Sequence, residues 1–113
     1  MIRYLNPLYT TDKTAGKCEK IQRKMRMGAG LIGLYLITLS ESESDVFDIY
    51  NVVLFKQRYF RHRNYDVIGV AESEEAAFDL VRRIHDDYFN VFGTYIGIKA
   101  ELRSRLDEQE TIN

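Results

Sequence analysis

The chain has 113 residues and a formal net charge of −1, with 45% hydrophobic and 29% charged residues. These values are typical of one globular domain and exclude a disordered or low-complexity chain. The near-zero charge provides no overall field that would attract nucleic acid or a membrane. One cysteine allows no internal disulfide, and the longest apolar run, residues 31–39, is shorter than the ~20 residues that cross a bilayer. Because no secretory signal pattern is visible, we expect a cytoplasmic protein without a membrane partner.

The charges are divided unevenly along the chain. Residues 1–63 carry 11 Lys and Arg against 6 Asp and Glu, a net of +5, whereas residues 64–113 carry 5 against 11, a net of −6. This division predicts a bipolar surface that favours head-to-tail attraction between copies. The alternative is that solvated helix faces differ in sign without consequence.

The first third of the chain predicts an arm, a basic helix and a strand. Residues 1–11 are an extended arm or an edge strand, because Pro7 is tolerated only at the edge of a sheet. Residues 12–27 are a helix capped by Thr11 or Asp12, since apolar residues recur every three or four positions. Its remaining faces are basic and carry Lys13, Lys17, Lys20, Arg23, Lys24 and Arg26. Residues 31–39 form a strand that is apolar on both faces, as in a parallel sheet covered on two sides.

Residues 45–61 are predicted to form a second helix, following a turn at residues 40–44. This segment is apolar nearly all round, and such a helix is buried all round. One sheet face of a small domain cannot cover it, so we expect burial against another helix and against a second copy of the protein. The side chains expected at that self-association surface are Phe47, Tyr50, Leu54, Phe55 and Tyr59.

The last part of the chain predicts a strand at residues 64–71 and an amphipathic helix capped by Ser73 and ended by Gly93. Residues 94–98 are predicted as a further strand and residues 99–106 as a short helix. The domain is expected to span residues 1–106, with a mobile polar tail at residues 107–113.

A weak internal repeat suggests how these elements are arranged. A shift of 31 residues places 35–50 on 66–81 without a gap, so that Glu-Ser-Glu and Phe-Asp recur at matching positions. Two tandem strand-turn-helix units predict parallel strands. The expected fold is therefore α/β, with a small three- to four-stranded, mainly parallel sheet and an N-terminal basic helix.

The two turns that follow these strands are acidic. Because the carboxyl ends of neighbouring parallel strands meet at one edge, the carboxylates of Glu41, Glu43, Glu72 and Glu74 are weak candidates for a Mg²⁺-type site. Such a site would make the protein a metal-dependent enzyme. The alternative is that carboxylates and serines simply suit helix starts. No cofactor is expected.

Two basic clusters, at residues 13–26 and 56–63, suggest a nucleic-acid-associated accessory role as a second possibility. The candidate contacts are Lys17, Lys20, Lys24, Arg58, Arg61 and Arg63. Against this possibility stand the near-zero net charge and the lack of a base-reading motif. The leading hypothesis is therefore a non-enzymatic assembly or adaptor module that forms a homo-oligomer, for example a homodimer, through residues 45–61.

A resemblance to known proteins rests on four features of the sequence. They are the segments Tyr35–Ser40 and Val67–Ala71, the Leu-x-x-Gln and paired Arg between them, and Glu75-Ala76 after them. Over residues 17–98 the chain resembles a group of small bacterial proteins, most from anaerobic Gram-positive bacteria, with the pattern YLITL strand, VGIA strand and EALELV helix. It departs from that pattern at Glu72-Ser73. The resemblance implies an α/β fold and a bacterial source, and it implies no activity and no site.

Overall fold

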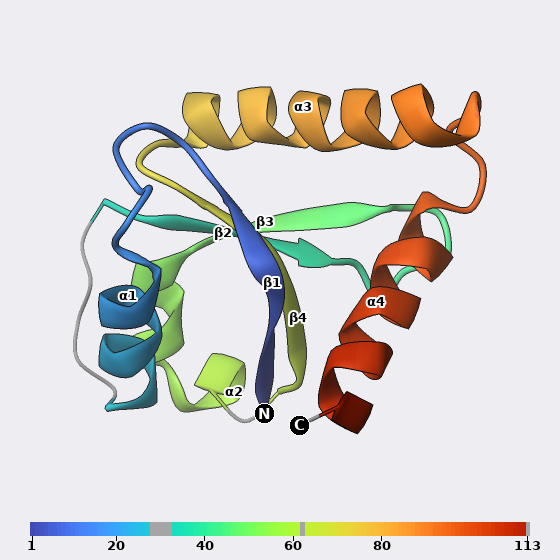
Figure 1. Cartoon of the computed structure of the whole chain (residues 1–113). Coiled ribbons are helices and arrows are strands. Elements are labelled where there is room, and N and C mark those ends of the chain that lie inside the picture. Colours follow the sequence, from blue (N-terminus) through green and yellow to red (C-terminus); the bar gives the residue numbers. More distant parts are fainter. Residues whose placement is uncertain (28–32, 62, 113) are drawn as a thin grey trace.

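The computed structural model describes residues 1–27, 33–61 and 63–112, which form a four-stranded sheet with helices on both faces (Figure 1). The elements in chain order are β1 (Ile2–Thr10), α1 (Cys18–Arg26), β2 (Tyr35–Leu39), β3 (Phe47–Asn51), the 3-10 helix η1 (Val52–Lys56), α2 (Arg58–Arg61), β4 (Tyr65–Ala71), α3 (Glu74–Phe92) and α4 (Ile98–Ile112). The α/β fold class with a small sheet is as expected from the sequence. Within the described residues, no helix has the length and apolar character that crossing a bilayer requires.

The sheet is mixed, so the expectation of a mainly parallel sheet is wrong. The strand order is β1-β4-β2-β3. Only β1 and β4 pair in parallel, whereas β2 is antiparallel to both β4 and β3. The two strands of the apparent repeat, β2 and β4, are indeed neighbours, but they run in opposite directions. Tandem duplication of one strand-turn-helix unit therefore does not describe this fold.

The predicted helix at residues 45–61 is instead strand β3, helix η1 and the short helix α2. The apolar residues of 46–55 are mostly β-branched or aromatic, and these residue types favour strands. Alternation is also present, because Phe47 and Ile49 pack on one face of the sheet and Tyr50 on the other. The part of α3 inside the repeat, residues 74–81, contains two Glu, two Ala and one Leu, which favour helix. The shared Phe-Asp letters thus lie in different secondary structures.

Two boundaries in the first third of the chain also differ from the prediction. Helix α1 begins only at Cys18, because Gly16 has a φ of +78° that ends the preceding turns, and Lys17 at the N-cap makes no side-chain capping bond. Of the predicted strand at residues 31–39, only 35–39 is strand, and residues 31 and 32 lie outside the described residues.

The C-terminal region differs as well. Residues 94–98 do not form a strand; they turn the chain into α4. Helix α4 continues to Ile112, so the expected mobile tail is helical over residues 107–112.

Helix α3 confirms its predicted caps. The Ser73 hydroxyl accepts a hydrogen bond from the backbone N–H of Ala76 at 3.0 Å. Gly93 adopts the left-handed conformation with φ +70°, and its N–H donates to the carbonyl of Phe89.

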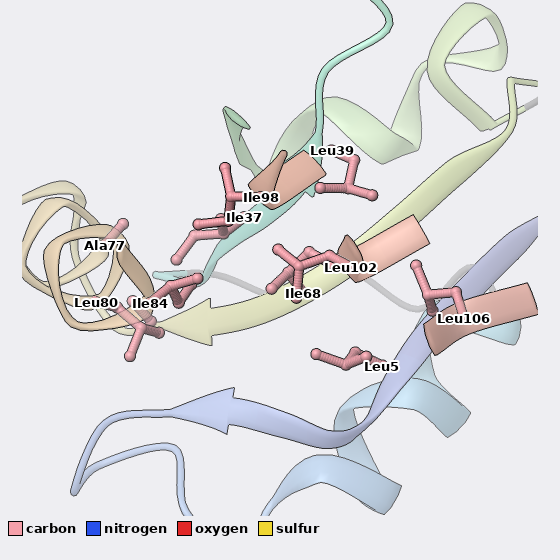
Figure 2. Packing of buried hydrophobic residues seen from close by; sticks show 11 residues of the cluster. Leu5, Ile37, Leu39, Ile68, Ala77, Leu80, Ile84, Ile98, Leu102 and Leu106 are labelled. Atoms are coloured by element: carbon pink, nitrogen blue, oxygen red, sulfur yellow. The ribbon is translucent and has the colours of Figure 1, made fainter. Parts of the chain in front are cut away.

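Each face of the sheet carries its own hydrophobic core. Helices α3 and α4 cover one face, where Ile37 and Ile68 meet Leu80, Ile84 and side chains of α4 (Figure 2). Helices α1 and η1 cover the other face through Ile21, Val52 and Phe55. The buried α4 residues are Ile98, Leu102 and Leu106.

This layering converts the uneven charge of the sequence into two layers of opposite sign. Residues 1–63 supply α1, η1 and α2, on one side of the sheet, and residues 64–113 supply α3 and α4, on the other (Figure 1). The net charges of +5 and −6 therefore divide largely between the two helical layers. The basic layer is the one built on α1.

Candidate functional site

The five residues expected to mediate self-association lie in three elements, and most of them are covered within the chain. Phe55 is buried, Phe47, Tyr50 and Leu54 are half-buried, and only Tyr59 is largely exposed. The Tyr50, Phe55 and Tyr65 rings pack edge-on, with centroid separations of 4.8–6.2 Å. The reason for expecting a second copy over residues 45–61, a helix without cover, is therefore wrong. The segment is not one helix, and the cores on the two faces of the sheet cover most of its apolar side chains.

The acidic turns are not brought together. Since β2 and β4 are antiparallel, Glu41 and Glu43 follow one end of the sheet and Glu72 and Glu74 the other. Glu41 instead accepts a hydrogen bond from Arg63 at 3.3 Å. Within the described parts of the chain, no three His, Cys, Asp or Glu side chains are grouped as a metal site would require.

Glu72 has a local partner. The Thr11 hydroxyl donates to its carboxylate at 2.5 Å, and this bond, together with Lys13, holds the pKa of Glu72 below its usual range. Glu72 therefore stays ionised at neutral pH.

The basic candidates divide into two groups. Lys17, Lys20 and Lys24 lie along α1 and line one cavity. Arg63 is engaged, because it pairs with Glu41 and its guanidinium lies 5.6 Å and 5.8 Å from the ring centroids of Tyr59 and Tyr65. The side chains of Arg58 and Arg61, and all of His62, lie outside the described part of the structure.

The α1 layer also shields a tyrosine of β1. Tyr4 packs against the core that contains Ile21, and burial raises the pKa of its phenol to about 12, with Arg26 opposing the shift. The pKa of Tyr4 is higher in the folded state than the value of 10 in the unfolded state. Its ionisation therefore leaves the free energy of unfolding unchanged below pH 10 and lowers it as pH rises towards 12.

We therefore expect the stability of Tyr4→Phe relative to the wild type to increase at high pH, because phenylalanine has no hydroxyl to ionise. Its urea-unfolding free energy relative to wild type should increase by roughly 1 kcal/mol between pH 9 and pH 11.5, after allowance for partial exposure. A difference that does not change over this range would contradict the raised pKa.

An aromatic surface that the sequence analysis did not identify lies along one flank of α3. Phe78, His85 and Phe89 are spaced by seven and four residues and share one side of the helix. His85 meets the Phe47 ring of β3 edge-on at 5.4 Å and lies 6.0 Å from Tyr95, which stacks against Phe89 at 4.9 Å. The sequence does contain a signal for this surface, because Phe78 and Phe89 are aromatic residues outside the buried stripe of an amphipathic helix. The sequence analysis considered only the buried stripe.

Three rings of this flank, defined here as Phe78, His85, Phe89 and Tyr95, are exposed to solvent, whereas His85 is half-buried. Phe78 is 56%, Phe89 42% and Tyr95 51% exposed. Monomeric proteins seldom expose aromatic side chains in a contiguous group, and such groups mark interaction surfaces.

Strand β3, next to this flank, forms a free edge of the sheet. Backbone bonds from Ser40 N–H to Val46 O and from Val52 N–H to Leu34 O bracket its pairing with β2. Since hydrogen-bonded residues alternate in an antiparallel ladder, the N–H and C=O groups of residues 47, 49 and 51 point away from β2. Among the described residues, no other strand pairs with this edge.

The opposite edge, β1, is blocked. Pro7 removes one donor from it. The Gln109 side chain of α4 accepts from the Asn6 N–H at 3.3 Å and donates to the Asn6 carbonyl. Proteins cover or interrupt edge strands to prevent pairing with other chains. The contrast leaves β3 as the available edge.

Comparison with known proteins gives no relative to set beside this geometry: no protein-family model, no curated protein and no solved structure matches the chain. The functional argument therefore depends on the surface of the molecule itself.

Proposed function

We propose that the protein is an assembly module that forms a homodimer, in which two copies pair through the free edge of β3 and through the aromatic flank of α3. The observation that carries this proposal is the continuity of the two features. The Phe47 ring of β3 contacts His85 of α3, so the free backbone groups and the exposed rings form one surface. The hypothesis of self-association is kept from the sequence, but the surface now consists of the β3 edge, which is only a part of residues 45–61, together with the aromatic flank of α3.

A second copy fits this surface better than an unrelated strand does, because the edge is self-complementary. Antiparallel pairing of β3 around a two-fold axis at Ile49 sets Ile49 opposite its own copy and Phe47 opposite Asn51. In this register Asp48 lies opposite Tyr50, so the two carboxylates do not meet. The product is a continuous eight-stranded sheet in which the α3 flanks of both copies lie on the same face.

Light scattering after size-exclusion chromatography tests the proposal. The wild type should have twice the 13.3 kDa mass of the chain at micromolar concentration. Ile49→Pro removes an outward N–H without breaking the bonds to β2, and edge strands tolerate proline. We expect this variant to have the mass of one chain while its circular dichroism stays unchanged.

Helix α3 provides a second variant and its control. Phe89→Glu places a charge on the aromatic flank and should also give a monomer. Val91→Glu is the control, because Val91 is 75% exposed on the same helix but lines the cavity between α3 and α4, away from β3. A monomeric wild type, or dissociation by Val91→Glu alone, would refute pairing through β3.

A further inference from the structure

A cavity of about 330 Å³ opens beside α1, in the basic layer of the molecule. It lies between the β1–α1 turns, the length of α1 and the residue before β2. Four of its lining side chains are lysines, and the complete lining is Lys13, Thr14, Lys17, Lys20, Ile21, Lys24, Leu34 and Glu72. No residue of the edge strand β3 lines this cavity, so the two surfaces are separate.

The four lysines form a row, here called the lysine row: Lys13, Lys17, Lys20 and Lys24. Lys20 and Lys24 lie one turn apart in α1, Lys17 is its N-cap residue, and Lys13 lies in the turns before the helix. All four line the same cavity, and the like charges of Lys20 and Lys24 destabilise the helix by a few tenths of a kcal/mol. In the described part of the chain none of the four belongs to an ion pair within 4 Å, although six such pairs occur elsewhere.

The one acid in the lining does not neutralise the row. The Thr11 hydroxyl donates to Glu72, and this bond, with a smaller contribution from Lys13, lowers the pKa of Glu72. The lining therefore keeps an excess of three positive charges. Helices α3 and α4, which carry most of the acidic residues of the second half of the chain, cover the other face of the sheet (Figure 1).

The lining also indicates which part of an anionic ligand would be recognised. Besides the lysines and Glu72, the lining consists of two aliphatic side chains and of Thr14, whose buried hydroxyl already donates to the Val70 carbonyl at 3.0 Å. It contains no aromatic ring on which a base could stack. Lys17 and Lys24 are seven residues apart, about 10 Å along the helix. One strand of B-DNA has a phosphate about every 3.4 Å along the duplex axis, and successive phosphates lie farther apart than this because the strand winds around the axis. With its long side chains, the row can therefore reach about two to three phosphates.

We propose that the lysine row binds the phosphate backbone of nucleic acid without reading its sequence. Lys17, Lys20 and Lys24 contact consecutive phosphates, and Lys13 extends the contact at the turn. Arg23, Arg26 and Lys56, which belong to the same layer, add long-range attraction. Binding of this kind depends on counterion release and weakens steeply with salt.

Fluorescence anisotropy with a labelled 20-base-pair DNA duplex tests this inference. Wild type should bind at 50 mM salt and weaken as salt rises. Lys17→Gln with Lys20→Gln should weaken binding about tenfold at 50 mM salt and reduce the slope of log affinity against log salt by about two, one for each lost phosphate contact.

The matched control removes two cations from the opposite layer. Arg82→Gln with Arg83→Gln changes the net charge by the same amount and should leave affinity within about twofold. Equal losses in both double variants, or no binding by wild type at 50 mM salt, would overturn the inference. Binding of inorganic triphosphate that needs the lysines, with no binding of DNA, would overturn the assignment to nucleic acid.

The inference does not depend on self-association. The monomeric Ile49→Pro variant should lose affinity for DNA by the same factor when Lys17 and Lys20 are replaced. If this factor disappears in the monomer, the lysine row is not the binding site of the single chain, and the inference fails while the dimer proposal stands.

Discussion

Gly69→Val is expected to lower the free energy of unfolding by about 3 kcal/mol, and Gly69→Ala by about 1 kcal/mol. Gly69 lies in β4 between β1 and β2 and below α3. A Cβ atom built on it would lie 3.2 Å from both the Cβ and the carbonyl O of Tyr9, and 3.1 Å from Leu80 Cδ2. Leu80 can rotate, but the Tyr9 contact includes backbone, so β1 itself would have to move.

The glycine is required by the pairing geometry of the strand. The register between β1 and β4 shifts between Tyr4 and Tyr9, and the register between β4 and β2 shifts between Ile37 and Thr38. Tyr9 and Ile37 both have Gly69 as their partner, so it stands beside both irregularities. Glycine in a strand often marks such a close approach of backbones.

Urea unfolding of the two variants measures this effect. Ala adds one carbon and restricts the unfolded chain, which partly offsets the contact cost, whereas Val adds two further carbons in a filled interior. The order of stability should therefore be wild type, Ala, Val. A Gly69→Ala protein more stable than the wild type would show that β1 accommodates the extra carbon without strain.

The sequence predicted the elements whose signals are local. Helix α3 was identified from its spacing and both caps, because Ser73 and Gly93 act within one turn of the helix. Strand β4 was identified because a short apolar run with Val and Ile is bounded by turn residues. These features depend on neighbours in the chain and not on the partner element.

The errors came from signals that depend on tertiary pairing. Residues 46–55 contain only two polar residues, Asp48 and Asn51, so periodicity alone could not separate a helix from a strand followed by a 3-10 turn. The wrong direction predicted for β2 relative to β4 follows from that error. A strand in place of the expected helix reverses the path of the chain once more, so β2 and β4 are antiparallel. The acidic turns were then placed at one edge of the sheet when they lie at opposite ends.

The candidate surfaces divide in the same way. The lysines of α1 could be named from the sequence, because helical spacing puts them on one side. The aromatic flank could not, since the contact of Phe47 with His85 joins residues 38 positions apart and exists only once β3 is a strand. Likewise, which edge of the sheet is blocked depends on Gln109 reaching Asn6 across the whole chain.

The second large effect is expected where the two ends of the chain meet. The Arg3 guanidinium forms a two-point contact with Asp66, its cross-strand neighbour in β4, at 2.8 and 3.0 Å. It also donates to Asp107 at 2.7 Å and Glu110 at 3.1 Å of α4. The bond to Asp66 is the main cause that raises the pKa of Arg3, and the side chains of Arg3 and Asp66 are only 20% and 18% exposed. This ion cluster ties β1, β4 and α4 together.

Arg3→Met should therefore lower the free energy of unfolding by about 2 kcal/mol, because Asp66 then keeps only Arg103 at 3.6 Å while remaining mostly covered. Arg3→Lys should restore little of this stability, since lysine cannot make the two-point contact.

The control is Arg82→Met. The partner of Arg82 is Asp79, which lies 3.7 Å away, and both side chains are mostly in solvent, so the effect should stay below about 0.5 kcal/mol. Adding Asp66→Asn to Arg3→Met should recover part of the loss, because it removes the uncompensated charge. Urea unfolding of the wild type and these four variants measures the effects. Equal effects of Arg3→Met and Arg82→Met would show that the cluster behaves as an ordinary surface ion pair.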